Sequence, residues 1–185
     1  MTTASDCIRK YQAFLKLEKS LSENTLVAYM SDLQKLMDFS SGKSLTDIKH
    51  EDLEQFLCQL RDLGISPRSQ ARILSGIKSF YGFLLIEDYI SADPTELIET
   101  PRLGKKLPEV LSVTEIDSLL AGIDLSRKEG QRNKAMLETL YSCGLRVSEL
   151  TGLKLSHCYF KEEYLMVDGK GSKQRLVPIS NKAMR

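Results

Sequence analysis

Arg146 and Glu149 are the residues whose types and spacing first suggest chemistry. They lie in the segment LYSCGLRVSELTGLKLSH, in which the apolar pattern assigns the arginine, between Leu145 and Val147, to the core. Burying a guanidinium is costly unless an anion meets it. If a helix begins again after Gly144, its free N–H groups and its dipole also favour an anion such as phosphate near Arg146. Glu149, one turn later, could orient the arginine. A purely structural Arg146–Glu149 ion pair is the alternative, and the residues alone leave both open.

Lys170 is the second candidate, in the segment DGKGSK. Glycines on both sides allow a tight turn and leave the lysine unobstructed, so that its ammonium could enter a cleft. Phosphoryl transfer needs a proton donor at the leaving oxygen and positive charge around the other oxygens. A solvated turn lysine is the alternative. The segment lacks the spacing of a nucleotide-binding P-loop, so nucleotide hydrolysis is not supported.

Other basic and polar residues suit contacts with backbone phosphates, although a solvated surface explains each of them individually. Residues 101–185 hold 15 Lys and Arg against 10 Asp and Glu, whereas residues 1–100 hold 11 against 15, so the second half carries +5 and the first −4. A basic half favours an anionic partner. The candidates for DNA binding are Lys173 and Arg175 after Lys170, Lys105 and Lys106 in a linker, Arg68, Arg72 and Lys78 on a predicted fourth helix, and Thr25 and Tyr29 on the second.

The elements that must position these residues divide into two groups. Apolar residues at helical spacing predict four helices in the first ninety residues, with Ser22 and Ser66 as N-caps and Gly64 as a stop. Three prolines between residues 91 and 111 predict an extended linker. Beyond it we expect a helix capped by Ser112, then a helix with Met136, Leu137, Leu140 and Tyr141 facing inward. Alternation on both sides of GKGSK predicts a β-hairpin.

The composition excludes several other classes of protein. The 185 residues are 42% hydrophobic and 28% charged, values typical of globular domains. No apolar run is long enough for a membrane span, and the first residues lack an apolar signal-peptide core, so a cytoplasmic location is expected. Four cysteines without a CxxC pair and only two histidines argue against a zinc site.

The two long motifs, LYSCGLRVSELTGLKLSH and GKGSKQRLVPIS, together resemble those of the tyrosine recombinases, or phage integrase family, and most closely those of Xer-type site-specific recombinases. The resemblance covers nearly the whole chain. It implies a mainly α fold, in which a four-helix, SAM-like core-binding domain (residues 1–90) and a linker (91–111) precede an α+β catalytic domain (112–185). That domain would be cut after its β-hairpin.

The resemblance also implies a reaction and its participants. A tyrosine attacks a DNA phosphodiester to form a 3′-phosphotyrosyl link, and the freed 5′-hydroxyl later attacks a partner strand, without metal or cofactor. Arg146 corresponds to the arginine that clamps the scissile phosphate, Lys170 to the general acid and Glu149 to the acidic residue that supports the arginine. The partners would be double-stranded DNA and, in a complete protein, a homo- or hetero-tetramer assembled on it. Chromosome dimer resolution and mobile-element integration both fit.

The sequence also departs from the family pattern. Neither histidine begins a His-x-x-Arg motif, and none of the seven tyrosines has the context of the nucleophile. His157 stands where aspartate is more often expected. We therefore expect this chain alone not to cleave DNA. A non-catalytic DNA-binding protein derived from the same family, and a helical protein-interaction module, are the alternatives.

Overall fold

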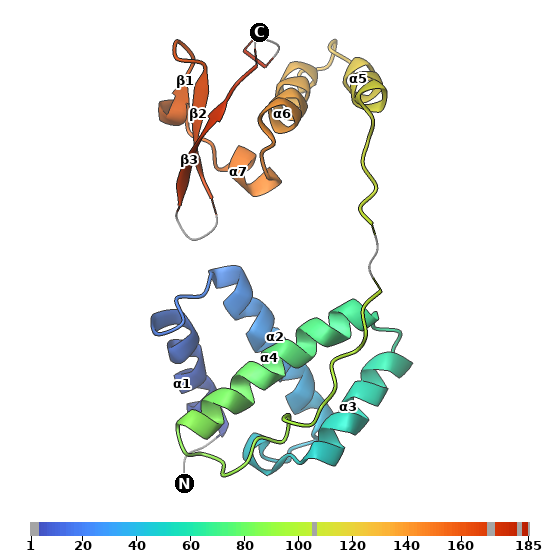
Figure 1. The fold of residues 1–185 in the computed structure, drawn as a ribbon, viewed down its shortest axis with the longest axis vertical. Helices are drawn as coiled ribbons and strands as arrows, with labels where there is room; N and C mark the ends of the chain where they lie inside the picture. Colours follow the sequence, from blue (N-terminus) through green and yellow to red (C-terminus); the bar gives the residue numbers. More distant parts are fainter. Residues whose placement is uncertain (1–3, 105–106, 170–172, 181–182, 185) are drawn as a thin grey trace. The chain divides into compact units, whose positions relative to one another are not determined.

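The computed structural model describes residues 4–104, 107–169, 173–180 and 183–184, the side chains from residue 6 onward, and it divides the chain into two compact units. The first unit comprises residues 1–106 and the second residues 107–185 (Figure 1). Each unit has its own hydrophobic core.

The first unit is built from the four helices that the sequence predicts. They are α1 (Ala4–Leu17), α2 (Glu23–Phe39), α3 (His50–Asp62) and α4 (Pro67–Ile86), with a 3₁₀ turn at Leu45–Asp47. Ser22 and Ser66 cap α2 and α4, because their hydroxyls accept the free N–H groups of Thr25 and Ser69. Gly64 follows α3 with φ 74°, a left-handed conformation that glycine adopts without strain. The predicted helix signals are therefore confirmed in this unit.

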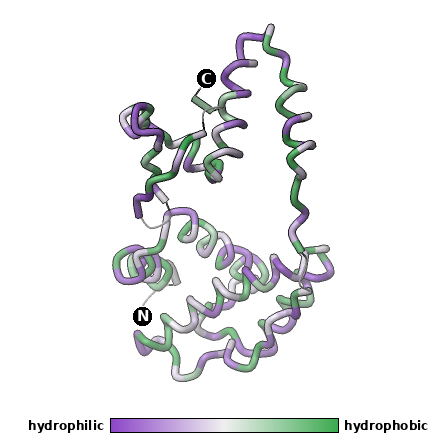
Figure 2. Tube along the Cα trace, turned by 45° about the horizontal axis from the view of Figure 1, so that its top comes forward, coloured by the Kyte–Doolittle hydropathy of each residue, from purple (hydrophilic) through white to green (hydrophobic). Residues whose placement is uncertain are grey.

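Helix α4 forms the centre of the first unit. Its residues Ile77, Phe80 and Leu84 are fully buried, and its Tyr81 donates its hydroxyl to the carbonyl of Leu45 at 2.9 Å. Tyr11 of α1 packs edge-on against the ring of Phe80. Each fully buried aromatic or large aliphatic side chain contributes about 1.5–3 kcal/mol. Hydrophobic and hydrophilic residues alternate along these helices, as their amphipathic faces require (Figure 2).

The beginning of the predicted linker packs on the first unit. Ile98 is buried in the core of that unit, and its carbonyl accepts a hydrogen bond from the ammonium of Lys78 at 2.8 Å. Thr95 is buried as well, and its N–H and hydroxyl both donate to the carboxylate of Asp93 in a local turn. The proline-rich composition of residues 91–111 gave no indication that the beginning of this segment packs on the first unit. The second unit begins at residue 107.

The second unit combines short helices with a small sheet. It contains α5 (Val113–Ala121), α6 (Gly130–Cys143), α7 (Val147–Thr151), a 3₁₀ turn (Leu155–His157), β1 (Cys158–Tyr159), β2 (Tyr164–Asp168) and β3 (Gln174–Pro178). The strands are antiparallel in the order β1-β2-β3. Strands β2 and β3 form the predicted hairpin, in which Val167 pairs with Arg175. Strand β1, only two residues long, was not predicted because it is too short to show alternation.

Helix α6 is less buried than the sequence predicts. Leu137 and Leu140 are half-buried, but Met136 and Tyr141 are 36% and 51% exposed, so the prediction that both face inward is wrong. No residue of α5 is buried either. The described elements of this unit cover only part of its apolar surface. Its core comprises Cys143, Leu145, Leu165, Val167, Val177 and Ile179.

The architecture is thus mainly helical, with a four-helix unit followed by an α+β unit, as predicted. Across the described residues, none of the helices has the length and apolar character that a membrane span requires.

Candidate functional site

Arg146 is placed by the turn between α6 and α7. Gly144 ends α6 in a left-handed conformation, φ 57°, and its N–H bonds the carbonyl of Leu140. Leu145 is buried, and Arg146 is then the extended residue that begins α7. The arginine side chain is 69% exposed, and so is Val147 beside it, at 68%. The prediction of a core position for Arg146 is therefore wrong, because the residue that enters the core is Leu145.

Glu149 is the buried member of the pair. Its side chain is only 3% exposed, and Oε1 accepts a hydrogen bond from Nη1 of Arg146 at 2.8 Å. Oε2 accepts the backbone N–H of Arg146, also at 2.8 Å, which satisfies a free donor at the beginning of α7. Glu149 thus fixes both the backbone and the side chain of Arg146. Because α7 has only five residues, its dipole adds little to this arrangement.

A second guanidinium binds the same carboxylate of Glu149. Arg175, on β3, donates from Nη1 to Oε1 of Glu149 at 2.7 Å and from Nη2 to Oε2 at 2.9 Å. Hydrogen bonds from Arg175 and from the backbone of Arg146 hold the pKa of Glu149 far below its usual range, so the carboxylate is ionised at neutral pH. Two cations share one anion, and the group keeps a positive charge toward solvent. The sequence predicted a DNA contact for Arg175 and missed its pairing with Glu149.

Gly169, the last described residue before the hairpin connection, lies beside this network. The N–H of Gly169 donates to the carbonyl of Lys173 at 2.8 Å. A Cβ atom added at Gly169 would lie 3.5 Å from Nη1 of Arg175 and 3.8 Å from Oε1 of Glu149. Lys173 is exposed. Lys170 lies outside the described residues, as do Lys105 and Lys106, so their predicted roles remain predictions.

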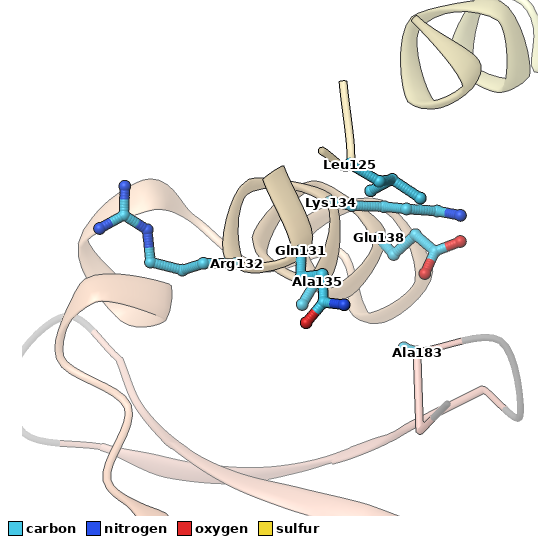
Figure 3. Close-up of a pocket in the computed structure, with 7 residues that line it drawn as sticks. All are labelled: Leu125, Gln131, Arg132, Lys134, Ala135, Glu138 and Ala183. Carbon is cyan, nitrogen blue, oxygen red and sulfur yellow. The ribbon is translucent and has the colours of Figure 1, made fainter. Parts of the chain in front are cut away.

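The described residues of the second unit line pockets, of which two are considered for a site. One, of about 240 Å³, is lined by residues of α7, the 3₁₀ turn and β2, including Glu149, His157 and Asp168. In it Nδ1 of His157 lies 3.8 Å from the carboxylate of Asp168. The other, of about 750 Å³, lies along α6 (Figure 3), where the side chain of Arg132 points away from Lys134 and Glu138. This wider pocket contains no predicted site residue.

The candidates of the first unit lie on α2 and α4. Thr25 is half-buried, its hydroxyl 2.9 Å from that of Ser22, and Tyr29 packs against the core. Arg68 and Arg72 are exposed and lie one turn apart on α4, whereas Lys78 points about 120° away from Arg72 around the helix. The three basic residues therefore lie on the predicted helix but on two of its faces.

Two residues beside Arg72, Asp32 and Lys35, were not predicted from the sequence. Asp32 is completely buried, and it binds the guanidinium of Arg72 at 2.6 and 2.7 Å. Lys35 lies 3.6 Å from the same carboxylate. A signal for Asp32 existed, because a carboxylate lies within the apolar stripe of α2, three residues after Tyr29. Among the described residues, no group of three or more His, Cys, Asp or Glu side chains is arranged to hold a metal ion.

Comparison with known families agrees with the resemblance seen in the sequence. The model of the phage integrase N-terminal SAM-like domain matches residues 8–88, and that of the phage integrase family matches residues 109–185. Together they cover most of both units.

Individual relatives carry the name of one enzyme. The chain is 44% identical to tyrosine recombinase XerD of Pseudomonas putida over 172 residues, which are 92% of this chain and 58% of the relative. It is 41% identical to tyrosine recombinase XerD of Staphylococcus epidermidis over 177 residues, which are 94% of this chain and 60% of the relative. The chain thus spans somewhat more than half the length of these relatives.

Solved structures share the fold at low sequence identity. A lambda integrase tetramer bound to a Holliday junction is 19% identical, with a TM-score of 0.77 over 100% of this chain and 53% of that one. The Tn1549 transposon integrase in complex with a circular intermediate DNA is 16% identical, with a TM-score of 0.70 over 96% of this chain and 62% of that one.

Proposed function

We propose that this chain, which belongs to the phage integrase family of tyrosine recombinases, acts in site-specific DNA recombination. In this proposal the first unit binds double-stranded DNA and the second supplies part of the catalytic site. The reaction is cleavage and rejoining of DNA strands through a 3′-phosphotyrosyl intermediate. The complete protein would act as a tetramer on two DNA sites, in Xer-like chromosome dimer resolution or in the integration of a mobile element.

The observation that carries this proposal is the arrangement of Arg146. Its guanidinium is exposed to solvent, yet it is held by a carboxylate that is almost completely buried. A guanidinium fixed in this way loses little further freedom when it binds a phosphate, and charge-assisted hydrogen bonds are strong. Positive groups that are in place before the reaction stabilise the charge that develops on the non-bridging oxygens of the phosphate.

Lys170 is proposed as the general acid. After the tyrosine has lost its phenolic proton to a base, its oxygen forms a bond to phosphorus, the bond from phosphorus to the 5′-oxygen breaks, and Lys170 gives its proton to that oxygen. The position of Gly169 near Glu149 and Arg175 supports this role, because it brings the beginning of the hairpin connection to the network that holds Arg146.

The nucleophile is assigned to a part of the complete protein that follows the hairpin. None of the seven tyrosines of this chain has the sequence context of the family's nucleophile, and Tyr11 and Tyr81 are also fully buried. We therefore propose that the 185 residues alone bind DNA without cleaving it. The complete protein is one that carries these residues together with the nucleophile.

A non-catalytic DNA-binding protein is the second candidate. The observation that favours it is the arrangement of Arg146, because an exposed guanidinium held by Glu149 can bind a phosphate without cleaving the strand, whereas the family's His-x-x-Arg motif is needed only for cleavage. The complete coding sequence distinguishes the two, because the enzyme requires this motif and a tyrosine after the hairpin.

The proposal is tested first by duplex binding. Fluorescence anisotropy with a labelled duplex at about 50 mM salt should show strong binding, and the affinity should fall steeply as salt is raised, because each neutralised phosphate releases counterions. A chain that binds no duplex under these conditions would instead be a helical interaction module. A covalent adduct between the 185-residue chain and a suicide DNA substrate would contradict the assignment of the nucleophile.

A further inference from the structure

The first unit contains a second exposed guanidinium held by a buried carboxylate. Asp32 of α2 has no exposed side-chain surface, and its two oxygens accept hydrogen bonds from Nη1 and Nη2 of Arg72 on α4 at 2.6 and 2.7 Å. Lys35, one turn after Asp32, places its ammonium 3.6 Å from the same carboxylate. The side chains of Arg72 and Lys35 are 48% and 41% exposed. A buried anion therefore lies beneath two cations that face solvent.

Stability alone is a weak explanation for this arrangement. Removing a carboxylate from water is costly, and replacing a buried ion pair by apolar residues is often neutral or stabilising. Asp32 is adjacent to the buried Leu33 and one turn before the buried Leu36, so that an apolar residue would fit the pattern of α2. What the carboxylate adds, and an apolar residue does not, is a fixed orientation of Arg72.

The packing of α4 is adapted to Asp32. A Cβ atom added at Gly76 would lie 2.9 Å from Oδ2 of Asp32 and 3.4 Å from the ring of Tyr29. Glycine in the middle of a helix lowers helix stability, yet α4 has one at this position. Any other residue would displace the carboxylate that holds Arg72.

The guanidinium that results is suited to bind an anion. Arginine has five N–H donors, and Asp32 takes one from each Nη atom, so the Nε–H edge is left for another acceptor. The hydrogen bond to Asp32 raises the pKa of Arg72, which therefore stays charged. Two cations outweigh one carboxylate, and Arg68, exposed one turn earlier on α4, adds a third positive charge.

We propose that Asp32 is a positioning residue that fixes the guanidinium of Arg72 for a backbone phosphate of duplex DNA. This inference rests on the proposed function, because it specifies how the first unit contacts its DNA. It assigns a role in DNA binding to a carboxylate, although a negative charge by itself would repel the phosphates of DNA.

The direction of the effect of Asp32→Asn separates positioning from simple charge. If Asp32 were only a negative charge near DNA, its neutralisation would tighten binding. If it positions Arg72, the amide loses one of the two hydrogen bonds and binding weakens, by about threefold, since charged hydrogen bonds are the strong ones. Asp38→Asn is the matched control. It removes an exposed carboxylate six residues along the same helix, where Asp38 accepts a hydrogen bond from the side-chain amide of Gln34, and it should leave binding unchanged or tighter.

A double-mutant cycle separates positioning from a general structural role. In the 185-residue chain, Arg72→Ala should weaken binding of a labelled duplex about tenfold and reduce the slope of log affinity against log salt by about one. Asp32→Asn should cause no further loss in the Arg72→Ala background, because it acts through that guanidinium. Thermal unfolding of each variant reports the structural effect separately. Should Asp32→Asn not fold, Arg72→Lys, which keeps the charge without the planar fork, should weaken binding by about threefold.

Four results would overturn the inference. The first is unchanged or tighter duplex binding by folded Asp32→Asn, and the second is that Asp32→Asn weakens binding as much in the Arg72→Ala background as in the wild type. The third is wild-type affinity in Arg72→Lys. The fourth is a loss of affinity in Arg72→Ala that is confined to duplexes with one base sequence, which would indicate base recognition. A wild-type chain that binds no duplex overturns the proposed function and, with it, this inference.

Discussion

Arg175 binds Glu149 through both of its Nη atoms, at 2.7 and 2.9 Å, and thereby joins strand β3 to helix α7. The same carboxylate holds the backbone and the side chain of Arg146. A displacement of the hairpin would therefore change the position of Arg146, because both contact Glu149. This relationship explains how an acidic residue can support an arginine for which we propose a role in phosphate binding.

The Glu149 network should make the second unit sensitive to acid. The hydrogen bonds from Arg175 and Arg146 lower the pKa of Glu149 in the folded protein. Their stabilisation is present above the ordinary pKa of glutamate, about 4.3, and is lost as the pH falls further toward the folded value. Hydrogen exchange of the second unit should show protection falling more steeply between about pH 5 and pH 3 in the wild type than in Glu149→Gln.

The control for this experiment is Glu162→Gln, in the exposed turn before β2. It should follow the wild-type pH dependence. Equal pH dependence in the wild type and in Glu149→Gln would show that the network does not stabilise the fold through an ionised carboxylate.

Gly144 should be required for the turn that places Arg146. Because its φ is 57°, alanine there is forced into the left-handed region, at a cost of about 1–2 kcal/mol. Gly122, which follows α5, has φ −72°, and the atom nearest to an added Cβ is at 3.5 Å, an ordinary contact. In urea unfolding, Gly144→Ala should lower the free energy of unfolding by that amount, whereas Gly122→Ala should leave it unchanged or raise it by up to about 1 kcal/mol. Equal effects would mean that the left-handed turn is not what matters.

Strand cleavage should no longer need Lys170 when the DNA substrate carries a better leaving group. In the complete protein, Lys170→Ala should slow strand cleavage by about 10² to 10⁴, the usual contribution of general acid catalysis. A substrate with a 5′-bridging phosphorothiolate should restore the rate, because a thiolate leaves without a proton. The same substrate should not rescue Arg146→Ala. If Lys170→Ala stays slow on the phosphorothiolate, Lys170 is not the acid.

Much of the fold was predictable because its signals are local. Caps such as Ser22 and Ser112, and glycines such as Gly64, mark the ends of helices, and the alternation around GKGSK marks the hairpin. The Arg146–Glu149 contact was predictable too, since residues three apart on a helix are neighbours.

The errors arise where tertiary contacts decide. Arg175 is 26 residues from Glu149, and Arg72 is 40 residues from Asp32, so that no local pattern announces either pair. Ile98 anchors a segment whose prolines suggested a free linker. The exposure of Tyr141 depends on which elements cover α6, and helical periodicity alone does not contain that information.

The most direct test of the account is the effect of Arg146→Ala on strand cleavage in the complete protein. Duplex affinity and covalent capture on a suicide DNA substrate would be measured on the same preparation. If the guanidinium held by Glu149 acts on the scissile phosphate, the variant should bind the duplex within about tenfold of the wild type and form the covalent adduct at least about 10²-fold more slowly. Adduct formation at the wild-type rate would contradict the account.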